Sequence, residues 1–416
     1  MSQDLHTEMQ AKIEALVPLA ELGPELSPEE TARYARHLSL PGFGVEAQRR
    51  LKAAKVFVVG AGGLGSPVLQ YLAAAGVGTI GLIDDDVVEV TNLQRQVIHR
   101  TASIGQHKVD SAAAEVTALN PHVTVHKYAQ RLSPENILDL IKDYDLVLDG
   151  TDNFGTRYLV NDACELTGTP LVWGTIFRFA AQLSVFYPSV GPTLRDLFPE
   201  IPDPASVPSC AEGGVLGVLP GLVGTAMATE AIKLLAGVGE PAIGRVLIYD
   251  AWKMSWHTLN LLPDPDRPPV TDLTEAAFVC AANPTEGADD PAALKRTEGP
   301  QVAPENLETE LAHPRHALID VRDGWERDVL AIPGSIHVPL ADIQERKWEA
   351  INETLAEVGV ATPETIVLHC KSGARSGQAQ QILTEAVGTH AGPEVKNLTG
   401  GVLAWAEKYS PDSPRY

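Results

Sequence analysis

The sequence predicts an α/β protein with two unlike domains, and three features of the chain lead to this fold class. Between residues 27 and 262, short apolar runs alternate with helical stretches, a pattern that favours a parallel sheet. Four prolines then crowd together from Pro263 to Pro269, and the chain up to Pro304 is rich in Pro, Ala, Glu and Asp with little periodicity. A second α/β pattern follows, so a poorly ordered linker is expected to join the two domains.

The expected strands of the first domain are four buried apolar runs and two later alternating runs that turn the sheet into a mixed one: 56–59, 80–83, 146–148, 171–173, 182–186 and 245–249. In the second domain, the strand-like runs are 317–321 and 366–369. The predicted boundaries are an N-terminal helical extension, a first domain, a flexible linker and a second domain: 1–26, 27–264, 265–300 and 301–416.

Composition limits the classes of partner. The chain has 416 residues and a formal net charge of −22, which argues against nucleic acid and anionic lipid because both need clustered Lys and Arg. The N-terminus has neither a basic start nor an apolar core, so no signal peptide is expected. The longest apolar stretch, Val215 to Val238, contains Pro220, Glu230 and Lys233, which predicts a buried helix and its lead-in rather than a membrane span.

Four cysteines are scattered without paired spacing: Cys164, Cys210, Cys280 and Cys370. No disulfide framework is indicated, and a cytoplasmic location with its reducing conditions is expected.

A glycine-rich loop indicates a nucleotide site. The run Val56 to Val59 leads directly into Gly60 to Gly65, with the letters GAGGLG, and a helical stretch follows. Glycine lets the backbone turn tightly and approach a phosphate that faces a helix N-terminus. Asp84 follows the next strand, where Rossmann-like folds bind ribose hydroxyls. This signal alone fits an NAD enzyme equally well.

Charged residues further along the chain favour a triphosphate. A polar loop ends in Arg95, a second cation, Lys108, stands at a probable helix start, and Asp152 with Asn153 follows a strand end. Ligands of open α/β sheets collect at such strand ends. Two cations and a carboxylate suit a triphosphate with magnesium better than a nicotinamide. Each residue taken alone is more typical of an ordinary surface.

These residues resemble the MoeB/ThiF group of adenylyltransferases, relatives of the ubiquitin-activating enzymes, over about residues 29–262. The resemblance implies ATP as cofactor and names its contacts, with the rest of the polar loop as further candidates: Gly63, Asp84, Thr91, Asn92, Leu93, Gln94, Arg95, Lys108, Asp152 and Asn153. It also implies that Arg36 reaches the phosphates of a neighbouring subunit, so a homodimer is expected. Ser27 to Glu30 reads as a capping box, and its helix places Arg33 and Arg36 on one face, which could also be merely a solvated basic face.

The implied chemistry follows from charge. The carboxylate of the C-terminal glycine of a ubiquitin-like sulfur-carrier protein attacks the α-phosphorus of ATP, and pyrophosphate leaves. Attack by an anion on a polyanion needs neutralisation and in-line positioning. Arg95, Lys108 and Arg36 are expected to neutralise charge, and Asp152 to hold Mg²⁺. The product is an acyl-adenylate that awaits a sulfur nucleophile.

The chain departs from the family at a metal site. Many relatives carry two Cys-x-x-Cys pairs that bind zinc in a tetrahedron. Here the first pair falls at Thr193 and Asp196, and the second region keeps only Cys280. One thiolate cannot replace four ligands, so no structural zinc is expected.

The second domain carries a candidate sulfur site. His369 to Arg375, HCKSGAR, follows a strand and precedes a helix expected near Ser376. Backbone N–H groups, the helix dipole and flanking cations would stabilise a Cys370 thiolate. A phosphatase loop has five residues between Cys and Arg, whereas four stand here, so the cradle is too short for phosphate. The remaining alternative is an inert buried cysteine.

With three further segments this loop resembles the rhodanese family over about residues 301–409: 318–322, 332–336 and 397–401. The resemblance implies a persulfide on Cys370, loaded by a donor such as a cysteine desulfurase or thiosulfate. In the adenylyltransferase family, the cysteine matching Cys210 takes the activated carrier or completes sulfur release. Cys164 is expected to lie in the core.

The sequence thus predicts an adenylyltransferase and sulfurtransferase in one chain. An NAD-dependent oxidoreductase and a non-catalytic ATP-sensing scaffold stay open as alternatives. The pathway is also open among molybdopterin, thiamin, tRNA thiolation and cysteine synthesis.

Overall fold

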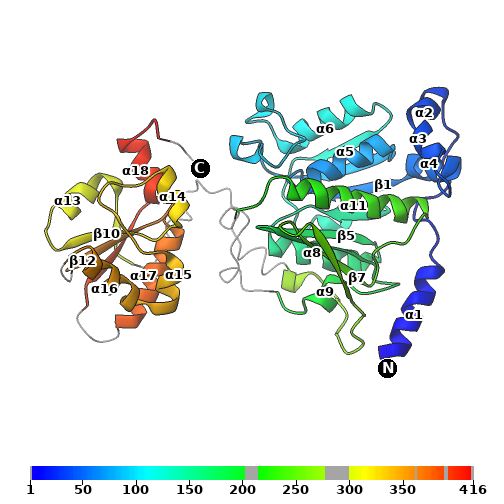
Figure 1. Ribbon diagram of the computed structural model, residues 1–416. Coiled ribbons are helices and arrows are strands. Elements are labelled where there is room, and N and C mark those ends of the chain that lie inside the picture. Colours follow the sequence, from blue (N-terminus) through cyan, green and yellow to red (C-terminus); the bar gives the residue numbers. More distant parts are fainter. Residues whose placement is uncertain (1, 202–213, 277–298, 361–362, 388–391, 414–416) are drawn as a thin grey trace. The chain divides into compact units, whose positions relative to one another are not determined.

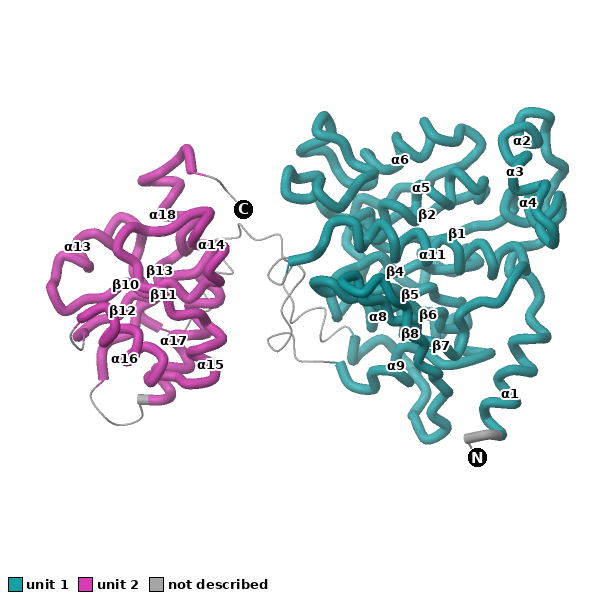
Figure 2. The backbone as a smooth tube through the Cα atoms, viewed as in Figure 1, with its two compact units in different colours: residues 1–284 teal, residues 285–416 magenta. Residues whose placement is uncertain are grey.

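The computed structural model describes all residues except 1, 202–213, 277–298, 361–362, 388–391 and 414–416. The chain divides into two compact units, residues 1–284 and 285–416 (Figure 2). Each unit has its own sheet and its own hydrophobic core.

The first unit is built on an eight-stranded mixed sheet in the order β3-β2-β1-β4-β5-β6-β7-β8. Figure 1 labels β1, β5 and β7 of this sheet. Neighbours from β3 to β5 are parallel, and β6, β7 and β8 continue the sheet antiparallel. The strands are β1 Lys55–Val59, β2 Thr79–Ile83, β3 Thr124–Tyr128, β4 Leu146–Asp149, β5 Leu171–Phe177, β6 Ala180–Phe186, β7 Arg245–Asp250 and β8 Ser255–Asn260. The predicted mixed sheet and its six predicted strands are confirmed.

The central strands are apolar on both faces because helices cover both sides. On β1, Val56 and Val58 belong to one buried cluster, while Phe57 and Val59 belong to another. This split follows from the two-residue period of a strand. The helices α5 (Gly65–Ala75) and α11 (Leu219–Ala236) pack together over the first cluster, and α7 (Ile137–Ile141) and α8 (Phe154–Thr167) contribute to the second.

Helix α11 is long and apolar enough to cross a membrane by length and composition alone. It packs against α5 and β5, and 61% of its 18 residues are buried inside the first unit, which is typical of a core helix. The sequence prediction of a buried helix is therefore supported.

The N-terminal elements differ from the expected single helix. The Ser27 capping box is present at the start of α2 (Pro28–Arg33), but the helix breaks at Tyr34 before α3 (Ala35–Leu38). Tyr34 is buried against Gly76 and accepts a hydrogen bond from Asn120 Nδ2 at 2.8 Å. Arg33 and Arg36 therefore lie on two consecutive helices, because the anchoring of Tyr34 outweighs helix continuity. Ahead of them, α1 spans Ser2–Glu14.

The chain from residue 263 to 276 also differs from the expectation of a poorly ordered linker. Leu273 and Ala276 are buried in the second core cluster of the first unit. Arg267 forms ion pairs with Glu165 and Asp196. These residues belong to the first unit, because apolar side chains and a buried charge pair outweigh the entropy of a proline-rich segment.

The second unit has a five-stranded parallel sheet in the order β11-β10-β12-β13-β9. Its strands are β9 Gln301–Val302, β10 His316–Asp320, β11 Ile336–His337, β12 Thr365–His369 and β13 Glu394–Leu398. Its helices are α13 Leu307–Leu311, α14 Gly324–Val329, α15 Leu340–Arg346, α16 Trp348–Glu357, α17 Ala374–Val387 and α18 Gly401–Tyr409. The prediction of a second, smaller α/β domain is confirmed.

Candidate active sites

The glycine loop joins the carboxyl end of β1 to the N-terminus of α5. Gly60 has φ +90°, a conformation that favours glycine, and a Cβ on Gly65 would collide with the carbonyl oxygen of Gly60. Ser66 and Val68 donate their N–H groups to the carbonyls of Gly62 and Leu64, and Pro67 has no N–H, so an anion would be bound by the loop N–H groups ahead of Ser66. The strands β2 and β4 flank β1, so this loop opens at the switch point of the sheet order.

Side chains from three elements hold the glycine loop. Asp84 Oδ2 accepts the N–H of Ala61 at 2.8 Å, and burial raises the pKa of Asp84. His99 Nε2 lies 2.9 Å from the carbonyl oxygen of Ala61, and Ser66 Oγ donates to Gly62 at 2.7 Å. Burial lowers the pKa of His99, which favours a neutral ring donating through Nε2. His99 is not marked by any local motif in the sequence, because its contact with Ala61 spans 38 residues.

The polar loop around Arg95 lies beside the glycine loop. A Cβ on Gly63 would lie 3.8 Å from Arg95 Cγ, and the Arg95 guanidinium donates to the carbonyl of Thr91 at 3.0 Å. Asn92 is buried, and its side chain accepts the N–H of Glu89 at 3.1 Å. Arg95 is therefore placed next to the nucleotide loop, whereas Asn92 shapes its own loop, which also carries Leu93 and Gln94.

Lys108 begins α6 (Lys108–Leu119) and pairs with a carboxylate that the sequence analysis did not single out. Its Nζ lies 2.7 Å from Asp86 Oδ2, and its N–H donates to the carbonyl of Asp86 at 2.9 Å. Lys108 is 6% exposed, whereas the Asp86 side chain is 55% exposed. The cation is thus held between the end of β2 and the start of α6.

The loop after β4 presents Asp152. Asp149 is fully buried, which raises its pKa, and its Oδ1 accepts the Thr151 hydroxyl at 2.6 Å. Arg157 donates to the Thr151 carbonyl at 3.0 Å, so the loop is held from both sides. Asp152 is exposed, and Asn153 caps α8 by accepting the N–H of Thr156 at 2.8 Å. A carboxylate is a ligand type that magnesium takes, so Asp152 could supply one ligand to the ion.

Arg36 is the one predicted nucleotide residue that lies away from this group. Its neighbour Tyr34 packs at Gly76, which caps the C-terminal end of α5. The glycine loop is at the opposite end of that helix, about 16 Å away at ~1.5 Å per residue. Arg36 is exposed and cannot serve the nucleotide loop of its own chain.

Cys370 opens the loop between β12 and α17. Its Sγ accepts the N–H of Gly373 at 3.1 Å and lies 3.3 Å from the Ser376 hydroxyl. Helix α17 begins at Ala374, two residues before the predicted start. Cys370 is 1% exposed, and its sulfur faces one backbone N–H and one hydroxyl within the loop.

Backbone contacts from α18 and β13 hold the same loop. The N–H groups of Val402 and Leu403 donate to the carbonyls of Cys370 and Lys371 at 2.8 and 3.2 Å. Asn397 Nδ2 donates to the Gly373 carbonyl at 3.0 Å. With its carbonyls bound from outside, the loop can direct its N–H groups toward the sulfur. This gives the Asn397–Gly401 motif a physical role.

Arg375 differs from the expected flanking cation. Its guanidinium donates two hydrogen bonds of 2.7 Å to the carboxylate of Glu326, which lies in the first turn of α14. Burial opposes ionisation of Glu326, but the Arg375 contacts prevail and lower its pKa. Arg375 therefore anchors the loop to α14. Glu326 is not marked by any local motif in the sequence, because its pairing with Arg375 spans 49 residues.

Of the three cysteines other than Cys370, the structure describes only Cys164. Cys164 is buried in the core as expected, and burial raises the pKa of its thiol. Cys210 and Cys280 lie outside the described residues. Thr193 and Asp196, at the positions of the first zinc-binding pair of the relatives, hydrogen bond to each other, so this pair does not fit a zinc ion.

Family models match both units. The ThiF family matches residues 34–269, and the rhodanese-like domain matches residues 303–408. A probable adenylyltransferase/sulfurtransferase MoeZ of Mycobacterium tuberculosis is 47% identical over 407 residues, which cover 97% of this chain and 99% of the relative. The adenylyltransferase and sulfurtransferase MOCS3 of Sus scrofa is 41% identical over an alignment that covers 97% of this chain and 92% of the relative.

Solved structures share the fold of the first unit. The microcin C7 biosynthetic enzyme MccB, in complex with N-formylated MccA, aligns with a TM-score of 0.53 at 22% identity, covering 57% of this chain and 75% of that one. E. coli MccB with ATP aligns with a TM-score of 0.51 at 23% identity, covering 57% and 74%. The full-length relatives favour neither an NAD-dependent oxidoreductase nor a non-catalytic scaffold. The chain therefore belongs to the ThiF family and is an adenylyltransferase/sulfurtransferase with a C-terminal rhodanese-like domain.

Proposed function

We propose that this enzyme uses ATP and Mg²⁺ to adenylate the C-terminal glycine carboxylate of a ubiquitin-like sulfur-carrier protein, and then converts it to a thiocarboxylate. The observation that carries the proposal is the presence of two candidate sites in one chain. In the first, the glycine loop and three further segments that carry Arg95, Lys108 and Asp152 follow β1, β2 and β4, and in the second an N–H and a hydroxyl lie against the Cys370 sulfur.

In the first step, the N–H groups of the glycine loop and the cations Arg95 and Lys108 bind the phosphates. They stabilise the charge that develops as the carboxylate attacks the α-phosphorus. A magnesium ion held by Asp152 would neutralise further phosphate charge. Pyrophosphate leaves, and AMP stays bound to the carrier as an acyl-adenylate.

Arg36 acts in the partner subunit of a homodimer. Its position at the far end of α5 supports this assignment, because the arginine is exposed yet remote from its own glycine loop. A second copy of the chain would bring it to the phosphates and complete the site.

In the second step, a Cys370 persulfide, loaded by a cysteine desulfurase or thiosulfate, attacks the carbonyl carbon of the acyl-adenylate and releases AMP. The product is an acyl disulfide between Cys370 and the carrier. A thiol, for which Cys210 is the candidate, then attacks the Cys370 sulfur. The carrier leaves as a thiocarboxylate, and the resulting disulfide needs a cellular thiol to reduce it, which fits a cytoplasmic enzyme.

The carrier docks on an apolar surface that continues from the nucleotide edge. Phe177, at the carboxyl end of β5, and Phe179 are 40% and 37% exposed. The turn between β7 and β8 adds Trp252, 73% exposed, whose ring centre lies 4.3 Å from that of Phe179. Strand β5 runs parallel to β4 and extends four residues beyond Trp173, the register partner of Asp149, so Phe177 lies on the same carboxyl side of the sheet as Asp152. A carrier bound there could extend its C-terminus to the phosphates.

The test is a pair of assays on the full chain with ATP, magnesium and a purified carrier. Carrier-dependent exchange of labelled pyrophosphate into ATP reports the first step. A mass increase of the carrier consistent with replacement of one oxygen by sulfur, after addition of thiosulfate and reductant, reports both. Pyrophosphate exchange in the absence of a carrier would contradict the proposal. So would a lack of exchange with every ubiquitin-like sulfur-carrier protein of the organism that makes this enzyme.

A further inference from the structure

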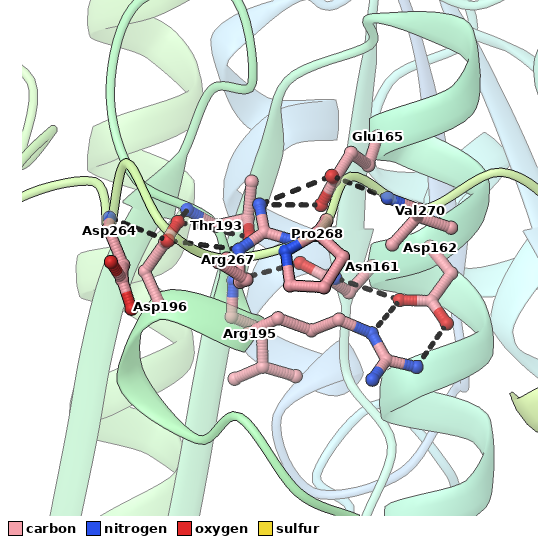
Figure 3. Close-up of polar contacts among 11 residues, drawn as sticks. Asn161, Asp162, Glu165, Thr193, Arg195, Asp196, Asp264, Arg267, Pro268 and Val270 are labelled. Atoms are coloured by element: carbon pink, nitrogen blue, oxygen red, sulfur yellow. Dashed lines mark hydrogen bonds and ion pairs between the residues drawn. The ribbon is translucent and has the colours of Figure 1, made fainter.

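The positions that carry the first zinc-binding cysteine pair in relatives are part of a charged cluster in this chain (Figure 3). Thr193 precedes the short helix α9 (Leu194–Leu197), and its N–H and hydroxyl lie 2.7 and 3.2 Å from Asp196 Oδ2. One oxygen of Asp196 is therefore used to cap its own helix. The side chain of Asp196 is 2% exposed, so its second oxygen also needs a partner within the protein.

That partner comes from the segment after β8. Asp196 Oδ1 accepts the N–H of Asp264 and Nε of Arg267, both at 3.0 Å. The other side of the Arg267 guanidinium contacts both carboxylate oxygens of Glu165 on α8 at 3.2 Å. Glu165 also accepts the N–H of Val270 at 3.2 Å. We call Asp196, Arg267 and Glu165 the ionic clasp.

Beside the clasp, Arg195 on α9 makes ion pairs with two further carboxylates, one on α8 and one near the end of the segment 264–276. Arg195 makes two hydrogen bonds to Asp162 at 2.8 and 2.7 Å, and its Nη2 lies 3.0 Å from Glu275. Beyond the clasp, Leu273 and Ala276 enter the core. Along the segment from Asp264 to Ala276, hydrogen bonds and ion pairs therefore hold residues 264–270, and the apolar contacts of Leu273 and Ala276 hold its C-terminal part.

The carboxylate oxygens of Asp196 and Glu165 already accept hydrogen bonds from within the chain, and the Arg267 guanidinium lies between them. A metal cation placed between Asp196 and Glu165 would displace Arg267 or be repelled by it. The two carboxylates are shared between α8, α9 and the segment from 264 to 270, so the clasp links chain positions that lie 71 and 102 residues apart. This is the topological role of a structural metal.

We propose that the ionic clasp takes the place of a structural zinc site, and that it fixes the segment 264–276 to the first unit without any metal. The guanidinium suits this role because its planar fork offers two separate edges to two carboxylates. The clasp side chains are between 2% and 16% exposed, so the pairs are shielded from salt more than surface pairs are. The inference does not rest on the reaction proposed for the enzyme.

The experiment compares Arg267→Met with Arg346→Met in the full-length protein. Methionine keeps the apolar stem and removes the charge, and Arg346 pairs with Glu353 at an exposed site of the second unit. Hydrogen exchange of the peptide 264–276, thermal unfolding with and without EDTA, and elemental analysis for zinc are measured on each.

The expected result has three parts. Wild-type protein contains far less than one zinc per chain, and EDTA leaves its unfolding temperature unchanged. Arg267→Met increases exchange in 264–276 by tenfold or more and lowers the unfolding temperature of the first unit by roughly 4 °C or more. Arg346→Met changes neither. Asp196→Asn, which keeps a cap for α9, should reproduce the exchange of Arg267→Met, and the double variant should add little.

Stoichiometric zinc together with a fall in unfolding temperature on EDTA treatment would overturn the proposal. So would normal exchange of 264–276 in both Arg267→Met and Asp196→Asn, because the segment would then be held by Leu273 and Ala276 alone. If Arg267→Met does not fold, Asp196→Asn alone decides. Catalytic activity is not among the readouts, so failure here is distinguishable from failure of the proposed reaction.

Discussion

Lys108 Nζ lies 2.7 Å from Asp86 Oδ2, so the buried cation at the nucleotide site has a carboxylate partner within the chain. We predict that Lys108→Ala lowers carrier-dependent pyrophosphate exchange about a hundredfold or more, because a phosphate-directed charge is lost. Thiosulfate sulfurtransferase activity should persist, because Lys108 and Cys370 belong to different units, each with its own sheet and core. A parallel loss of both activities would instead indicate misfolding.

The same pair predicts a ligand effect on stability. Asp86→Asn leaves Lys108 buried without its ion-pair partner, which destabilises the first unit until phosphates supply the missing negative charge. ATP with magnesium should therefore raise the unfolding temperature of Asp86→Asn by more degrees than that of the wild type. Asp139→Asn, which removes an exposed pair with Lys142, is the matched control. Equal shifts in all three proteins would show that Asp86 and the nucleotide do not share Lys108.

Cys370→Ala should separate the two chemistries. It removes the sulfur that accepts the Gly373 N–H in the second unit and leaves the glycine loop of the first unit unaltered in sequence. Pyrophosphate exchange should stay at the wild-type rate, while thiocarboxylate formation and sulfurtransferase activity are lost. Cys210→Ala should also keep adenylation and slow only the later transfer. Normal thiocarboxylate formation by Cys370→Ala would make the second domain an accessory to another sulfur route.

Gly401→Ala should impair sulfur transfer through the loop backbone. Gly401 has φ +59°, and a Cβ there would lie 2.5 Å from the carbonyls of Cys370 and Lys371. We expect kcat for sulfur transfer to fall tenfold or more with adenylation unchanged. Gly334→Ala is the control, since Gly334 has φ +80° with no atom within 4 Å of its Cβ position. If both variants lost the same activity, the strain of a left-handed backbone at alanine, costing about 1–2 kcal/mol, would explain the effect without the Cβ collision.

Arg36 provides a test of the homodimer. Arg36→Ala and Asp152→Ala should each be inactive in adenylation, because each removes a charged group from the phosphate site. Mixing the two proteins should restore part of the activity, since one site of each hybrid dimer receives both intact side chains. The measurement is pyrophosphate exchange after demonstrated subunit exchange. No recovery would place Arg36 outside the partner's site.

His369 predicts a pH dependence of the second unit. Burial lowers its pKa from 6.5 to about 4, so the folded state holds the neutral ring and the unfolded state takes up the proton first. This contribution to stability is complete above pH 6.5 and is lost as the pH falls toward 4, by about 3 kcal/mol at ~1.4 kcal/mol per unit. Exchange of the β12 amides at pH 7 and pH 4.5, wild type against His369→Asn, measures it. An unchanged difference between the two proteins would contradict the assignment.

The sequence by itself determined the fold class, both families and the reactive loops. The glycine loop, the HCKSGAR loop and the central strands are each made by residues adjacent in the chain, so local backbone rules and periodicity suffice to predict them. The loss of the zinc-binding cysteines was also visible at Thr193 and Asp196.

Only the tertiary structure decided the pairings between distant residues. Asp86 with Lys108, Glu326 with Arg375, and Arg267 with Asp196 and Glu165 are separated by 22 to 102 residues, and no local pattern marks which carboxylate a cation will meet. The break at Tyr34 and the attachment of residues 264–276 have the same origin. Local propensity favoured a continuous helix and a loose linker, but burial of specific side chains contributed more free energy than those preferences did.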